Sequence, residues 1–307
     1  MVYVKGLKDK GTDQLVWVDR KGNFQPLFSN GKDMDMPRIS PDGSKIAVTL
    51  LDGPNMDLWI LELKRNTFSR LTSHTGEDFG AVWSPDGKQL AYSSEIAEDA
   101  GEGGPGIALL TMDSSDPPIR LLSTPDSFDL EFPVSWSSNG EWILFSSTHG
   151  TVSSDLEVMS TITDQQKSWE QTSNSENGGV FSPDGKWIAY VSDLSGWDEV
   201  YVKPFSAGGS RIQVSVHGGI EPLWSPDGKE IFYREYDKLM VVSVENGPSL
   251  ILGSPQLLFE GSYKTSGYGG WAHNYDITPD GSRFVMINQT SQTRIREINV
   301  VINWDKI

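Results

Sequence analysis

Acidic side chains recur shortly before a repeated turn, and this recurrence is the first sign of possible chemistry. Five precede a turn serine by four to six residues and a sixth precedes the equivalent threonine by two: Asp35, Asp78, Glu131, Glu176, Glu221 and Asp276. If they point toward a common axis, they form a negative funnel suited to Ca²⁺ or a basic peptide. Because a shift of one residue turns a strand side chain to the opposite face, the unequal spacing also fits solvated loop carboxylates.

Three of the four histidines lie in the same kind of segment. His74, His217 and His273 precede a turn residue by five to ten positions. A metal held by histidines and carboxylates, with one open coordination position, can support catalysis. We therefore consider His217 and His273 as metal-ligand candidates, against the alternative that the histidines are scattered over the surface. Apart from such a metal, or Ca²⁺ at the mouth of the funnel, no cofactor is expected.

Two glycine-rich insertions, at 95–106 and 261–274, lengthen the spacing between turns. Long loops on a rigid scaffold often carry function. The second insertion contains a group that could stack on a peptide or a sugar, or could instead anchor the loop to its own part of the fold: Tyr263, Tyr268, Trp271 and His273. The first contains a G-x-G-x-x-G pattern, but its acidic neighbours and Pro105 are unsuited to binding phosphate.

The turns that position these residues form a sequence repeat. Ser-Pro-Asp-Gly stands before an alternating apolar stretch at Ser40, Ser84, Ser182 and Ser225, with altered copies at Ser137 and Thr278. Proline sets the second turn position and glycine takes a positive φ, so each copy predicts a hairpin. Spacings of 43 to 53 residues, each holding four strand-like stretches, predict the blades of a β-propeller.

We predict an all-β chain in which residues 1–307 form a single β-propeller domain of four-stranded blades. N-terminal stretches such as LVWVDRKG and FQPLF are expected to share the closing blade with C-terminal strands. Including INVVINW near the C-terminus, we count about 26 candidate strands, between the numbers that six and seven blades need. The chain length divided by a period of about 44 slightly favours seven blades and leaves six open.

Composition narrows the function classes. The net charge of −17 argues against a nucleic-acid partner, since phosphate binding needs a basic surface. The absence of cysteine removes disulfides, thiolate zinc sites and cysteine nucleophiles. No apolar run is long enough for a membrane span, and the first residues lack a signal peptide. No G-x-S-x-G motif is present, and the histidines are spread over different blades, which disfavours a serine hydrolase.

The Ser-Pro-Asp-Gly turn with its following strand resembles the TolB-like, WD-like β-propeller repeat. A closer likeness lies in LVWVDRKG, SPDGKWIAYVSDLSGWDEVYVKPF, GGIEPLWSPDGKEIFY and VVINW, which look like the C-terminal propeller of bacterial serine/threonine kinase or regulator multidomain proteins. The resemblance covers essentially the whole chain. It implies a protein-binding role and an extracytoplasmic or periplasmic location, and it implies no catalytic motif.

Two hypotheses follow. In the first, the chain is a non-catalytic scaffold or sensor module that binds a protein or peptide on the face formed by inter-blade loops. In the second, it is a metal-dependent propeller enzyme of lyase or lactonase type, acting on an acidic sugar or a lactone at the central channel. We favour the first and expect a monomer that does not insert into membranes.

Overall fold

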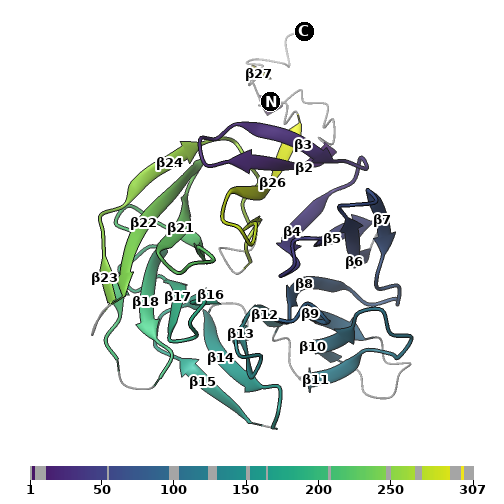
Figure 1. Ribbon diagram of the computed structural model, residues 1–307, viewed down its shortest axis with the longest axis horizontal. Helices are drawn as coiled ribbons and strands as arrows, with labels where there is room; N and C mark the ends of the chain where they lie inside the picture. Colours follow the sequence, from purple (N-terminus) through teal and green to yellow (C-terminus); the bar gives the residue numbers. More distant parts are fainter. Residues whose placement is uncertain are drawn as a thin grey trace.

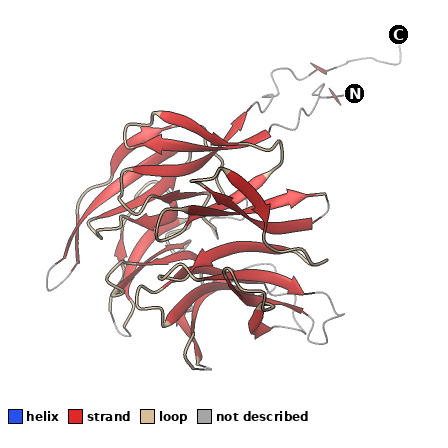
Figure 2. Cartoon of the chain, turned by 45° about the vertical axis from the view of Figure 1, so that its right-hand side comes forward, coloured by secondary structure: helices blue, strands red, loops and turns tan. Residues whose placement is uncertain are grey.

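Six four-stranded blades are arranged as a ring (Figure 1). The computed structural model describes residues 2–3, 12–53, 55–96, 104–123, 130–149, 153–163, 165–206, 209–246, 250–266, 272–290 and 299–300. Within these ranges the chain forms strands, turns and loops, without a helix (Figure 2). In particular, the described part offers no helix long and apolar enough to cross a membrane.

The first three blades follow the chain, each with its strands in sequence order from the inside of the ring outward. Blade 1 contains β4 (Met34–Ile39), β5 (Lys45–Asp52), β6 (Asn55–Glu62) and β7 (Thr67–Arg70). Blade 2 contains β8 (Asp78–Trp83), β9 (Gln89–Ile96), β10 (Gly104–Thr111) and β11 (Ile119–Ser123). Blade 3 contains β12 (Glu131–Trp136), β13 (Trp142–His149), β14 (Ser153–Ser160) and β15 (Gln166–Glu170).

The last three blades include the closure of the ring. Blade 4 contains β16 (Glu176–Phe181), β17 (Trp187–Ser192), β18 (Glu199–Pro204) and β19 (Ile212–Gln213). Blade 5 contains β20 (Ile220–Trp224), β21 (Glu230–Glu235), β22 (Lys238–Asn246) and β24 (Gln256–Glu260), with β23 (Leu250–Leu252) also on β22. Blade 6 joins both ends of the chain: β25 (Tyr275–Ile277), β26 (Arg283–Thr290), β2 (Thr12–Asp19) and β3 (Phe24–Phe28).

The blade count corrects the sequence prediction, because the ring has six blades and not the seven that chain length slightly favoured. The surplus strands do not form a further blade. β1 (Val2–Tyr3) pairs with β27 (Asn299–Val300) in a two-stranded ribbon of its own, whereas the C-terminal stretch had been counted with the ring. β23 is an additional strand on the end of β22. The shared closing blade, in contrast, forms as expected through antiparallel pairing of β2 with β26.

The repeated turns have nearly the same geometry in every blade. In all six, the serine or threonine hydroxyl donates to the aspartate or asparagine two residues later, at 2.5 to 2.7 Å. The same oxygen accepts the backbone N–H five residues later, at 2.9 to 3.3 Å. The turn glycines have φ between 69° and 78°, which favours glycine. The residues of the Ser-Pro-Asp-Gly motif therefore supply the hydrogen bonds and the glycine conformation that form each hairpin turn.

Blades pack on one another through buried apolar clusters. One cluster includes residues from the innermost strands of blades 1 to 4 together with Ala272, which lies just before β25. It brings Met36, Phe79 and Phe132 into one apolar group, and the Phe79 and Phe132 ring centroids are 5.7 Å apart. A Cβ added to Gly80 would lie 2.4 Å from the Phe132 ring. The interior of the ring is thus closely packed at this level.

Candidate functional site

The two faces of the ring carry different segments. One face bears the Ser-Pro-Asp-Gly turns and is called the turn face. The other, called the connection face, bears the segments that lead from each outermost strand to the next blade, and also the turns between second and third strands. The six carboxylates noted in the sequence all lie on the first or second residue of an innermost strand, at the connection face.

Asp35 and Asp276 are held by the junction between blades 6 and 1. The Lys264 ammonium lies 3.0 Å from Asp35 Oδ1 and 2.9 Å from Asp13 Oδ2, and Asn274 donates to Asp35 from 3.1 Å. Asp276 Oδ2 accepts the backbone N–H of Ile39 at 2.8 Å. Burial raises the pKa of both Asp35 and Asp276. These two carboxylates therefore connect the closing blade to its neighbour.

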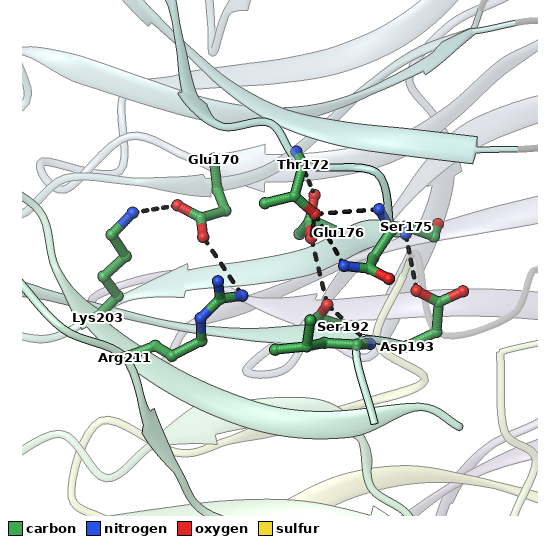
Figure 3. Close-up of polar contacts among 10 residues, drawn as sticks. Glu170, Thr172, Ser175, Glu176, Ser192, Asp193, Lys203 and Arg211 are labelled. Atoms are coloured by element: carbon green, nitrogen blue, oxygen red, sulfur yellow. Dashed lines mark hydrogen bonds and ion pairs between the residues drawn. The ribbon is translucent and has the colours of Figure 1, made fainter. Parts of the chain in front are cut away.

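Glu176 is enclosed by polar groups of blade 4 and of the segment before it (Figure 3). Its Oε1 accepts the Thr172 hydroxyl at 2.6 Å and the Ser192 hydroxyl at 3.3 Å. Burial raises the pKa of Glu176. Nearby, Glu170 forms ion pairs with Lys203 and Arg211. Through Thr172, the buried Glu176 stabilises the connection between β15 and β16.

Asp78 and Glu131 have partners of other kinds. His74 Nε2 lies 2.7 Å from Asp78 Oδ2, and this contact raises the pKa of the imidazole. The Ser147 hydroxyl donates to Glu131 Oε1 from 3.0 Å. Both carboxylates are buried. Glu221 accepts the backbone N–H of Ser266. All six predicted acids thus have contacts within the propeller, and a cation or peptide bound to them stays a prediction.

The two histidine candidates differ in their exposure to solvent. His273 is buried, its Nε2 lies 2.5 Å from the Pro222 carbonyl oxygen, and burial lowers its pKa to about 3. His217 is exposed in the connection between β19 and β20. In the described ranges, no group of three or more histidine, aspartate or glutamate side chains is arranged to hold a metal.

The aromatic residues of the long insertion are only partly described. Tyr263 pairs with Asn288 in an isolated bridge, and its ring packs edge-on against Phe259 with centroids 6.3 Å apart. This contact fits the alternative in which the ring anchors the loop to its own blade. Tyr268 and Trp271 lie outside the described residues.

An open pocket of about 600 Å³ lies on the connection face, between blades 4, 5 and 6. Its lining comes from the β17–β18 turn, the β19–β20 and β24–β25 connections, the β21–β22 turn and the end of β26: Trp197, Asp198, Gly218, Gly219, Ile220, Arg234, Glu235, Tyr236, Asp237, Ser262, Tyr263, Thr265 and Gln289. Trp197 and Tyr236 are 72% and 81% exposed. Aromatic rings exposed beside a cavity are typical of recognition surfaces.

The backbone holds these pocket residues in place. Tyr236 has a φ of 56°, which is uncommon for a bulky residue. The Asp198 carbonyl accepts the Gly219 N–H at 2.9 Å, and the Asp237 carbonyl accepts the Gly261 N–H at 2.8 Å. The β17–β18 and β21–β22 turns are thereby tied to the two inter-blade connections. Among the predicted site residues that the structure describes, Tyr263 alone belongs to this pocket.

Sequence comparison gives short matches to known proteins. No model of a protein family matches the chain. The Tol-Pal system protein TolB of Anaeromyxobacter sp. (strain K) is 34% identical over 87 residues, which are 28% of this chain and 20% of TolB. The uncharacterized peptidase YuxL of Bacillus subtilis (strain 168) is 26% identical over 205 residues, which are 64% of this chain and 28% of YuxL. The chain thus spans about a fifth to under a third of the length of these relatives.

Structure comparison covers nearly the whole chain. A candidate TolB from Agrobacterium tumefaciens superposes with a TM-score of 0.69 at 19% identity, over 91% of this chain and 98% of the other. TolB from Acinetobacter baumannii gives 0.59 at 17% identity, over 94% and 66%. An oligogalacturonate lyase in complex with manganese gives 0.58 at 13% identity, over 92% and 98%. The chain has a TolB-like β-propeller fold, as the repeat indicated.

Proposed function

We propose that the chain is a non-catalytic binding module that holds a segment of a protein partner on its connection face. The pocket between blades 4, 5 and 6 is the binding site in this proposal. The observation that carries it is the pair of exposed aromatic side chains, Trp197 and Tyr236, beside a cavity of about 600 Å³. Exposed tryptophan and tyrosine are the residues that most often dominate the energy of protein interfaces.

The charge of the pocket indicates which kind of partner segment would bind there. Asp198 and Asp237 lie in its lining, while Glu235 is paired with Lys238 at 3.0 Å. The net charge of −17 attracts cationic partners at a distance. The proposed partner segment is therefore basic, with aliphatic side-chain stems that contact the aromatic rings.

The proposal is tested by peptide binding to the full chain. A panel of fluorescently labelled 12-residue peptides, equal in length and either basic, acidic or neutral, is titrated and followed by anisotropy. We expect the basic peptides to bind, and the double substitution W197A/Y236A to weaken binding at least tenfold. Phe24→Ala is the matched control, because Phe24 is also an exposed aromatic (55%) but lies on β3 outside the pocket. Unchanged affinity in W197A/Y236A would refute this site.

The second candidate remains a metal-dependent enzyme, supported only by the fold shared with the manganese-bound lyase. It is tested by thermal unfolding with EDTA, Ca²⁺, Mn²⁺ and Zn²⁺, because a ligand that binds only the folded state raises Tm. A metal-specific rise that EDTA reverses would favour the enzyme. We also propose an extracytoplasmic location, which the similarity to TolB supports.

A further inference from the structure

Arg234 is a buried arginine in the wall of the pocket. It lies on β21 and is 1% exposed. Its Nη2 donates to the carbonyl oxygen of Tyr236 at 3.1 Å and lies 3.4 Å from that of Tyr263. The guanidinium is therefore held between the β21–β22 turn and the β24–β25 connection. This arrangement gives the cavity a positioned cationic group.

The charge of Arg234 has no direct partner in the described part of the chain. Glu221 is the acid whose charge acts on it, yet the two form no ion pair, and neither Arg234 Nε nor Glu221 Oε2 has a hydrogen-bond partner. Glu221 Oε1 instead accepts the Ser266 N–H at 2.5 Å. Burying a charge that is not fully paired destabilises a fold. The fold retains this arginine beside an open cavity despite that cost.

A carboxylate is the group that best matches such a site. The planar guanidinium binds carboxylates through parallel N–H···O hydrogen bonds, and these are stronger when one partner is buried and fixed. At the same time Asp198 and Asp237 line the pocket, so a purely anionic ligand would be repelled there. A ligand that carries a carboxylate next to a cation can pair with Arg234 and with these aspartates.

Resting on the proposed function, we propose that the pocket binds a peptide carboxylate on Arg234 next to a lysine or arginine side chain on Asp198 and Asp237. The aliphatic stem of that basic side chain contacts Trp197 and Tyr236. The carboxylate comes either from the C-terminus of the partner or from an adjacent acidic side chain. Both sources offer the same chemistry, and the experiment separates them.

The experiment compares three labelled peptides of equal length on the unaltered full chain. The first ends in lysine with a free carboxylate, the second ends in lysine amide, and the third is an amidated peptide with an internal glutamate–lysine pair. We expect the free carboxylate, the internal glutamate or both to bind at least tenfold more tightly than the lysine amide. Whichever of the two binds more tightly identifies the source.

Arg234→Gln should remove the advantage of the tighter carboxylate-bearing peptide over the lysine amide, and Arg234→Lys should restore part of it. Arg20→Gln is the control, because Arg20 pairs with Glu230 at 2.7 Å outside this pocket. If Arg234→Gln fails to fold, the peptide comparison on the unaltered chain still decides whether a carboxylate is recognised.

Two results would overturn the inference, and they differ in what they say of the proposed function. Equal affinity for all three peptides, with binding still lost in W197A/Y236A, would leave the binding module intact and refute carboxylate recognition. No binding of any peptide would refute both. Tighter binding of a galacturonate oligomer than of any peptide would assign Arg234 to a sugar acid and also reject the peptide.

Discussion

The turn face and the connection face both carry polar contacts that recur in every blade. The partners in these contacts are constant on the turn face and vary on the connection face. On the turn face, six turns use the same hydroxyl, the same acceptor position and a glycine of nearly the same φ. On the connection face, six carboxylates stand on the first or second residue of the innermost strands, but each has a different partner, such as Lys264 for Asp35 and His74 for Asp78. The repeated face specifies the architecture, and the varied face is free to specify recognition.

The largest expected effect tests how tightly the interior is packed. Gly80→Ala places a Cβ 2.4 Å from the Phe132 ring at a φ of 67°, so both backbone strain and overpacking oppose folding. We expect a loss of about 2–5 kcal/mol in the free energy of unfolding, measured with urea. Gly140→Ala is the control, because its φ is also positive (78°) but no atom lies within 4 Å of the new Cβ. A loss of about 1–2 kcal/mol is expected there. Equal losses would contradict the packing argument.

An intermediate effect tests the uniformity of the turn face. Ser182→Ala and Ser225→Ala each remove a hydroxyl that donates to aspartate at 2.7 Å and accepts a backbone N–H. Each variant should lose about 1–2 kcal/mol of unfolding free energy, because a backbone donor and a carboxylate lose their partner. The two losses should agree within about 0.5 kcal/mol. A much larger difference would break the claim that the repeated turns are equivalent.

The smallest expected effect is on the pH dependence of stability, which compares a carboxylate of the turn face with one of the connection face. On the turn face, the hydrogen bond from Thr278 is the main cause that lowers the pKa of Asp280 to about 2. Its contribution to stability is present above the ordinary pKa of 3.8 and is lost as pH falls from there toward 2. Asp280→Asn should therefore flatten the stability profile in that acidic window, as measured by urea unfolding at a series of pH values.

Glu176 on the connection face should behave in the opposite sense. Burial raises its pKa above the ordinary 4.5, so the ionised carboxylate disfavours folding as pH rises from 4.5 through the raised value. Glu176→Gln should remove this loss, so that the variant gains stability relative to the parent toward neutral pH. The same urea series measures it. Profiles of the same sign for both variants would contradict the proposed contrast between the faces.

The sequence predicted the hairpins well because the turn chemistry is local. Serine, aspartate and glycine interact with one another within six residues, so the pattern in the chain is the pattern in the structure. The blade number was wrong because it depends on how the surplus strands pair. β1 and β27 pair with each other, and β23 pairs with the end of β22, which no local pattern reports.

The candidate site was harder to predict because it forms between blades. Trp197, Arg234 and Tyr236 come from two hairpins that only the ring brings together. A signal did exist in LSGWDEV, where a tryptophan stands in a polar turn between two strands. Burial of Arg234 and the positive φ of Tyr236 are tertiary properties that the sequence pattern does not contain. The six acids lie at the strand starts, and some of their partners, such as Lys264 for Asp35, come from segments far away in the sequence.

The closing blade has a consequence for the order of folding. β2 precedes every other strand of the ring along the sequence, yet it pairs with β26, where Thr12 opposes Thr290. Joining segments so far apart costs about 5 kcal/mol of chain entropy by the logarithmic estimate. Until that step, β26 presents an unpaired apolar edge of the kind that promotes aggregation. Completion of the ring is therefore expected to be the slow event in folding, and the interval before it the most vulnerable to self-association.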